Sequence, residues 1–158
     1  MSQHYPYRKI LIPVDFSEVS VRSLRHGLGL ARAVGAAAVV LTVIDTSFPY
    51  PDLYSLDDPQ HDYFRVMRER AFKRIDEWLG SQPDAASVDI DRVVLRGRPA
   101  AVIPSFAEEV GADLMIVARH GSRGLRHALM GHTTENLVRS APCPVLVLPP
   151  EDAAAEDG

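Results

Sequence analysis

The feature that most constrains the fold is an alternation of short, almost wholly apolar runs with amphipathic stretches. The runs at 10–14 and 37–44 are apolar at nearly every position. Strands with continuous apolar sequence are typical of parallel sheets that are covered by helices on both faces. Further strands are expected at 88–95, 113–118 and 145–148. The order βαβαβαβαβ predicts a single α/β domain with a doubly wound parallel sheet and helices on both faces.

The helices are predicted from apolar residues that recur at spacings of three and four. The first helix ends near Gly35, and the third begins at Pro99 and ends at Gly111. Pro104 lies inside the third helix and lacks a backbone N–H, so we expect a kink or a later start there. A short last helix is expected from about 133 to 140.

The charge is unevenly distributed along the chain. The net charge is −4, from 17 Lys and Arg against 21 Asp and Glu, but four of the acids lie in 151–158. We therefore expect a domain over 1–150 with balanced charge, followed by an acidic disordered tail over 151–158. A body with balanced charge gives no general electrostatic reason to bind nucleic acid.

Three features predict a cytoplasmic protein. No apolar run approaches the roughly 18 residues of a membrane span, so no membrane partner is expected. The first residues lack the apolar core of a signal peptide. The chain has one cysteine, Cys143, which fits a reducing compartment.

The segment 119–132 indicates an anion site. It holds three arginines, three histidines and three glycines, with no acid, and it leads into a helix that starts with Thr133 and Thr134. Glycines let backbone N–H groups face a ligand, and a helix start adds unsatisfied donors. In a doubly wound sheet this segment lies at the carboxyl ends of the strands, where ligands bind. The alternative is a mobile loop whose arginines are solvated.

Asp15 ends the first strand at the same edge of the sheet. Its carboxylate is suited to accept hydrogen bonds from a ribose hydroxyl or a base, because it would repel a phosphate. The alternative role is to cap the helix that follows.

Other chemistries find no support in the sequence. The spacings of His120, His127 and His132 fit no common metal motif, and no metal site is expected. Neither a P-loop nor a Gly-x-Ser-x-Gly elbow is present. Gly27-Leu28-Gly29 lies within a predicted helix, so it is not a dinucleotide fingerprint, and Cys143 is expected to be a small buried hydrophobe. We expect no catalytic residue.

Several segments resemble the universal stress proteins, the UspA-like family of the adenine-nucleotide α-hydrolase superfamily. They are Ile10–Ser17, Val43–Asp45, Gly111–Leu114, Gly131–Asn136 and Ala141–Val147. The resemblance extends over roughly 7–149. It implies a five-stranded parallel sheet in the order 3-2-1-4-5 and a homodimer through the last strand, Val145–Leu148.

One branch of this family binds ATP through the pattern Gly-x2-Gly-x9-Gly-[Ser/Thr]. Here the pattern is degenerate, since Ala118 and His132 replace its first and last positions while Gly121 and Gly131 are kept. The resemblance implies an adenine-nucleotide site that holds ATP or a related nucleotide, with Mg²⁺ as an accompanying ion. The expected site residues are Pro13, Val14, Asp15, Val43, Val117, Ala118, His120, Gly121, Gly131, His132, Thr133 and Thr134.

Two functions remain open at this point. The first is a regulatory dimer of the stress response that binds an adenine nucleotide and hydrolyses it slowly at most. The alternative is a stress-response dimerisation module that binds no nucleotide, and Ala118 and His132 favour it. No residue of the sequence indicates which proteins this protein would act on.

Overall fold

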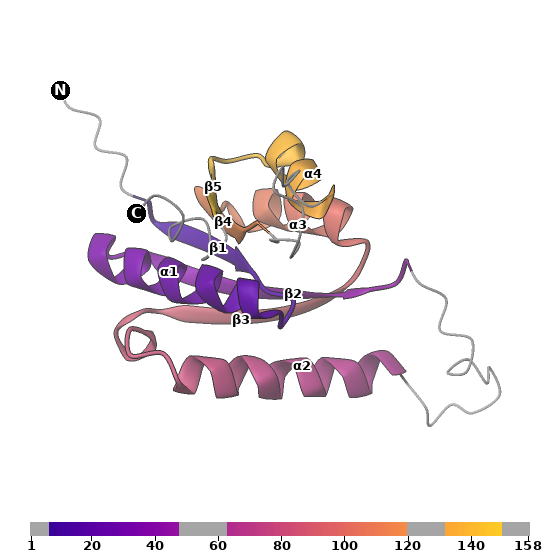
Figure 1. The fold of residues 1–158 in the computed structure, drawn as a ribbon, viewed down its shortest axis with the longest axis horizontal. Coiled ribbons are helices and arrows are strands. Elements are labelled where there is room, and N and C mark those ends of the chain that lie inside the picture. The colour runs from indigo at the N-terminus through magenta and orange to yellow at the C-terminus, as the bar shows by residue number, and fades with distance from the viewer. Residues whose placement is uncertain (1–6, 48–62, 120–131, 150–158) are drawn as a thin grey trace, which may run out of the picture.

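The apolar runs form the strands of one parallel sheet in the computed structural model, which describes residues 7–47, 63–119 and 132–149. The strands are β1 (Lys9–Pro13), β2 (Ala37–Asp45), β3 (Ile90–Gly97), β4 (Leu114–Ala118) and β5 (Val145–Leu148). They pair in the order β3-β2-β1-β4-β5, and every pairing is parallel (Figure 1). The predicted fold class and strand order are therefore confirmed.

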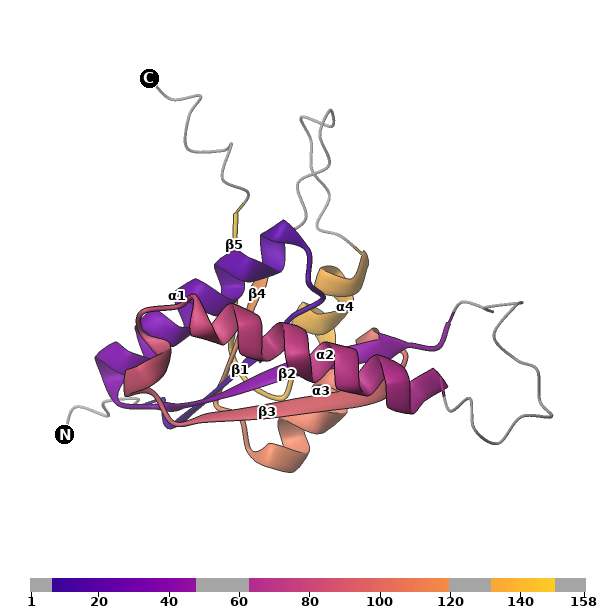
Figure 2. The same cartoon turned by 90° about the horizontal axis from the view of Figure 1, so that it is seen from below.

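Helices cover both faces of the sheet. They are α1 (Glu18–Val34), α2 (Tyr63–Gly80), α3 (Pro99–Val110) and α4 (His132–Ser140), with a short 3₁₀ helix, η1 (Ala85–Ser87). Alternate residues of β1 point to opposite faces. Ile10 and Ile12 pack in the cluster formed with α1 and α2, and Leu11 packs in the cluster formed with α3 and α4. Figure 2 shows α1 and α2 together on one side of the sheet.

α1 is defined at both ends by local backbone chemistry. Ser17 has extended backbone angles and its side chain accepts a hydrogen bond from the backbone N–H of Ser20, which makes it the N-cap. Gly35 ends the helix at φ 71°, a left-handed conformation that glycine adopts without strain. The predicted end of this helix is confirmed.

Two local predictions need correction. α3 begins at Pro99 and runs through Pro104 to Val110, so of the two alternatives expected at Pro104, a kink or a later start, the later start is wrong. The buried side chains of Ile103 and Ala107 pack against the sheet, and this burial offsets the hydrogen bond that Pro104 cannot donate. The third strand begins at Ile90 rather than at residue 88, because Val88 caps η1 and its backbone N–H donates to the Ala85 carbonyl.

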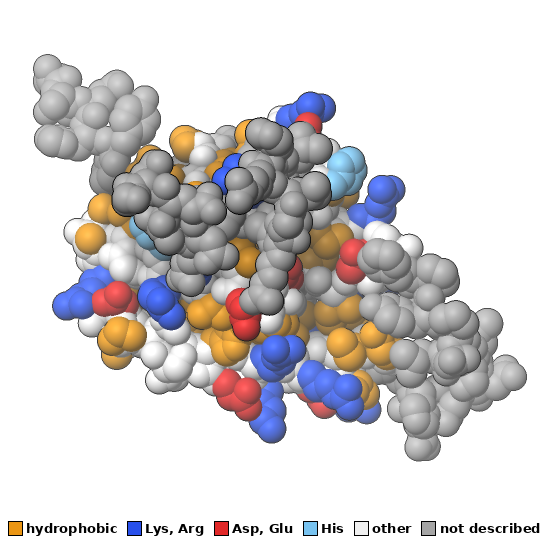
Figure 3. All heavy atoms as spheres, viewed as in Figure 1, with side chains coloured by type: hydrophobic (Ala, Val, Ile, Leu, Met, Phe, Trp, Pro, Cys, Tyr) orange, Lys and Arg blue, Asp and Glu red, His pale blue; other side chains and the backbone are white. Residues whose placement is uncertain are grey.

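Charged side chains of both signs are interspersed on the face shown in Figure 3. This is the distribution that a body with balanced charge predicts. In the described ranges no helix combines the length and the apolar character that crossing a membrane requires. The predicted acidic tail, 151–158, lies outside the described residues.

Candidate functional site

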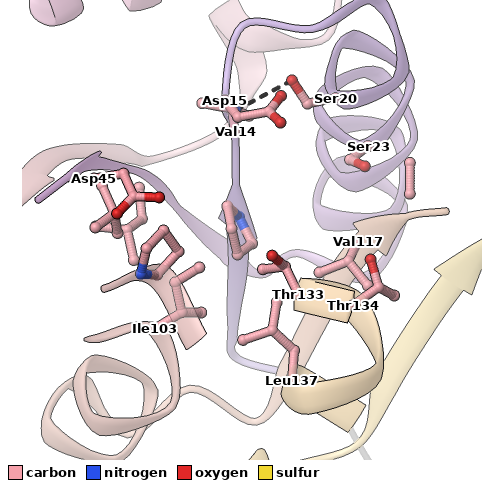
Figure 4. Close-up of a pocket in the computed structure, with 15 residues that line it drawn as sticks. Val14, Asp15, Ser20, Ser23, Asp45, Ile103, Val117, Thr133, Thr134 and Leu137 are labelled. Atoms are coloured by element: carbon pink, nitrogen blue, oxygen red, sulfur yellow. Dashed lines mark hydrogen bonds between the residues drawn. The ribbon is translucent and has the colours of Figure 1, made fainter. Parts of the chain in front are cut away.

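A cavity of about 260 Å³ lies at the carboxyl ends of β1 and β4. Its described lining comprises Pro13, Val14, Asp15, Ser20, Ser23, Leu41, Val43, Asp45, Pro99, Ile103, Val117, Ala118, Thr133, Thr134 and Leu137. Figure 4 shows Ser20 and Ser23 on α1, with Thr133, Thr134 and Leu137 contributed by α4. The lining therefore comes from both faces of the sheet.

The topology explains why a cavity forms at this place. β1 and β4 are neighbours, but the chain leaves β1 for α1 on one face and, later, leaves β4 for the face that carries α4. Diverging connections open a crevice beyond the strand ends, and this is where doubly wound sheets bind ligands. The position of the cavity matches the edge of the sheet that the sequence predicts.

Eight predicted site residues line this cavity. They are Pro13, Val14, Asp15, Val43, Val117, Ala118, Thr133 and Thr134. His132 begins α4 and is exposed, and it is not among the described lining residues. His120, Gly121 and Gly131 lie outside the described residues, so the glycine-rich part of the predicted site stays a prediction.

Asp15 does not cap α1, because Ser17 does. The Asp15 Oδ1 atom instead accepts hydrogen bonds from the Ser17 backbone N–H, at 3.0 Å, and from the Ser17 hydroxyl. The backbone N–H of Asp15 donates to the Ser20 Oγ at 3.3 Å. These bonds hold the turn between β1 and α1 and place an exposed carboxylate at the rim of the cavity.

Seven lining residues are absent from the predicted site. They are Ser20, Ser23, Leu41, Asp45, Pro99, Ile103 and Leu137. Asp45 was accessible to the same reasoning as Asp15, because it ends β2 at the same edge of the sheet. Ser20 and Ser23 are separated by three positions and share a helix face, but only the packing of α1 shows which face meets the site.

The described lining is rich in hydroxyls and contains two carboxylates, Asp15 and Asp45. None of the lining residues that the structure describes is Lys, Arg or His. The described walls therefore offer acceptors to ribose or base donors, and they offer neutral hydroxyl donors to acceptor oxygens. The first N–H groups of α4 are further donors for an anion at this edge.

Cys143 packs away from this cavity, against the cluster of α3 and α4. Burial raises the pKa of its thiol, and the carboxylate of Asp113 raises it further. A thiol whose pKa is raised is a weak nucleophile at neutral pH, which agrees with a packing role, but Cys143 is half-buried rather than buried as predicted. Among the described residues, no group of three or more His, Cys, Asp or Glu side chains is arranged to hold a metal ion.

Comparison with known proteins gives the family. The model of the universal stress protein family matches residues 6–149. The chain belongs to this family. Universal stress protein MJ0531 of Methanocaldococcus jannaschii is 32% identical over 145 residues, covering 90% of this chain and 82% of that protein. Universal stress protein MJ0577 of the same organism is 26% identical over 154 residues, covering 90% and 94%.

Solved structures agree with the fold. The structure of MJ0577 has a TM-score of 0.71 at 26% identity, covering 92% of this chain and 98% of that one. A universal stress protein solved in complex with cAMP has a TM-score of 0.59 at 24% identity, covering 90% and 97%. A likeness at this level of identity supports the same α/β architecture, and the residues of the cavity must carry any argument about ligands.

Proposed function

We propose that this universal stress protein binds ATP or another adenine nucleotide in the cavity beyond β1 and β4, and acts as a nucleotide-dependent regulator in the stress response. The observation that carries the proposal is the cavity itself. It occupies the switch point of the sheet, and it combines apolar walls with two carboxylates and several hydroxyls. Those are the groups that a nucleoside with a phosphate needs around it.

Each part of the nucleotide has suitable groups in this arrangement. Pro13, Val14, Val43 and Val117 would contact the base, and Asp15 and Asp45 would accept hydrogen bonds from ribose hydroxyls or the base amine. Thr133 and Thr134 would donate to phosphate oxygens. By the family pattern, Ala118, His120, Gly121, Gly131 and His132 would complete the phosphate site, with Mg²⁺ accompanying a polyphosphate.

Binding without turnover is the expected behaviour. Asp15 is expected at the ribose or base end of the nucleotide, away from the phosphates, and its Oδ1 already accepts hydrogen bonds from the Ser17 amide and hydroxyl, so it is not expected to activate water for attack on a phosphate. We therefore expect phosphate release from ATP to be slow at most. The relative solved with cAMP is in line with an adenine nucleotide as ligand.

Calorimetric titration with ATP and Mg²⁺ tests the proposal, after any nucleotide carried through purification has been released and identified by mass spectrometry. Asp15→Ala should weaken binding, whereas Asp91→Ala should not. Asp91 is an exposed aspartate of β3, outside the cavity lining, and serves as the matched control. No heat up to millimolar ATP and no carried nucleotide would overturn the proposal and leave the dimerisation module.

We also propose a cytoplasmic homodimer formed through β5. β5 ends the sheet order, so one side of its backbone has no neighbouring strand among the described residues. Leu146 on β5 is 36% exposed, and Val138 on α4 is 42% exposed. An unpaired apolar edge is a template for a second chain. Leu146→Lys should shift the protein toward monomer in sedimentation velocity, and a monomeric wild-type protein would contradict the proposal.

A further inference from the structure

Ser23 is the one lining residue whose buried hydroxyl has no hydrogen-bond partner among the described groups. Its side chain lies on α1, and the residue is 1% exposed. Buried hydroxyls in native proteins are almost always paired, with protein or with water. A hydroxyl left unpaired in the wall of a cavity is therefore available to a ligand in that cavity, and Ser23 is the hydroxyl of this kind at the proposed nucleotide site.

The packing of α1 places Ser23 at the centre of the switch point. One turn further along the same helix face, a Cβ placed on Gly27 would lie 2.5 Å from Ile12 and 3.6 Å from Ile116. α1 runs back against the direction of the strands (Figure 1). Four helical residues advance about 6 Å and two strand residues about 6.6 Å. Ser23 accordingly lies above the ends of β1 and β4, near Val14 and Ala118, with which it lines the cavity.

The other serine of this wall is already paired. The Ser20 hydroxyl donates to the Ser17 carbonyl at 3.1 Å and accepts from the Asp15 amide at 3.3 Å. Ser20 thereby stabilises the turn after β1, and Ser23 is the hydroxyl of α1 that remains for a ligand. Thr133 and Thr134 line the cavity from α4.

We infer that Ser23 is a direct ligand contact that selects for an acceptor oxygen in the ribose-phosphate part of the bound nucleotide. This inference rests on the proposed function. The carboxylates of Asp15 and Asp45 accept hydrogen bonds from ligand groups that donate them. Phosphate and ester oxygens of a ligand only accept hydrogen bonds, so they need a donor from the protein. Ser23 supplies the donor from α1, and Thr133 and Thr134 supply donors from α4. The ligand is in this way held from both faces of the sheet.

Ser23→Ala tests the inference in the full-length protein, with ATP and Mg²⁺ titrated by calorimetry. Loss of one hydrogen bond to the ligand should raise the Kd about tenfold. The chemical unfolding midpoint of the ligand-free variant should stay equal to that of the wild type or rise, because no internal hydrogen bond is removed. Ser23→Cys, which keeps the branching of the side chain but donates weakly, should also raise the Kd.

Thr42→Val provides a matched control. The Thr42 hydroxyl is also buried and unpartnered, but this residue lines a neighbouring cavity against α2, with Met67 and Ala71. The substitution removes a hydroxyl of the same kind with almost no change of shape. It should leave the Kd for ATP within about twofold of the wild type.

The outcomes separate the two claims. If the wild type binds ATP and Ser23→Ala binds it equally well, the inference is wrong and the proposed function stands. A clear fall in the unfolding midpoint of ligand-free Ser23→Ala would also overturn it, by showing that the hydroxyl is satisfied inside the protein. A wild type that binds no adenine nucleotide would overturn both.

Discussion

Replacing Gly27 by alanine perturbs the contact between α1 and β1 by a single methyl group. Its Cβ would lie 2.5 Å from Ile12 Cδ1 and 2.8 Å from Ile12 Cγ1, whereas carbon atoms in contact are about 3.5–4.0 Å apart. Ile12 is fully buried, so its side chain has no solvent-filled space to move into. The helix, the strand or the rotamer of Ile12 must shift by about an ångström.

Two opposing terms set the size of the effect. Alanine is a better helix former than glycine, by roughly 0.5–1 kcal/mol. Overpacking a filled core destabilises by about 1–3 kcal/mol. Because backbone and branched side chain both resist the shift, we expect Gly27→Ala to lower the free energy of unfolding by about 1–2 kcal/mol. Urea unfolding followed by circular dichroism measures it.

Gly29 is a control in the same helix. A Cβ placed there would meet only Asp84 Oδ2 at 3.5 Å, an ordinary contact, so Gly29→Ala should stabilise by roughly 0.5–1 kcal/mol through helix propensity alone. Ile12→Val removes the atom nearest to the new methyl group, so it should partly rescue Gly27→Ala in a double-mutant cycle. Gly27→Ala that is as stable as Gly29→Ala would refute the close packing of α1 on β1.

Other predictions concern the ends of elements and the thiol. Asp113→Ala should destabilise by about 1–3 kcal/mol in urea unfolding, because its carboxylate accepts from the backbone N–H groups of Arg8 at 2.7 Å and Lys9 at 3.1 Å, and an unchanged midpoint would contradict this. Ser17→Ala should cost about 1 kcal/mol by the same assay through loss of the N-cap, and Ser17→Thr, which keeps the hydroxyl, should restore most of it. Burial and, secondarily, the Asp113 carboxylate raise the pKa of the Cys143 thiol in the folded protein, so alkylation should reach half its maximal rate at a higher pH than in urea. The contribution of this thiol to the free energy of unfolding is fully present below the pKa of the unfolded thiol and is lost as pH rises through the folded pKa, and this loss should be absent in Cys143→Ser.

Much of the fold is visible in the sequence because its signals are local. Continuous apolar runs predict buried parallel strands, and spacings of three and four predict the helices between them. Gly35 and Gly111 end their helices as predicted, both with positive φ. The order of the strands came from the resemblance to the universal stress proteins, since periodicity says nothing about which strands are neighbours.

The candidate site was predicted mainly at the strand ends, although Asp45 at the end of β2 was missed. Asp15 and Val117 lie at strand ends, and parallel strands bring such ends to one edge of the sheet. Thr133 and Thr134 at the start of α4 were predicted, but Ser20 and Ser23 on α1 were missed, because a serine on α1 meets the cavity only when α1 is packed. Whether Asp15 caps α1 was likewise open in the sequence, and the structure shows that Ser17 is the N-cap instead.

The sequence by itself determined the elements, their directions and the edge of the sheet that carries the site, because hydrophobic periodicity and capping act over a few residues. Only the tertiary structure decided which side chains meet there. The absence of a side chain at Gly27 lets α1 pack closely against β1, and this packing positions Ser23 beside the strand ends that line the cavity. Pro104 stays within a helix because the sheet buries its neighbours. Such contacts join residues that are far apart in the chain. They depend on tertiary packing, which a pattern over a few neighbouring residues does not predict.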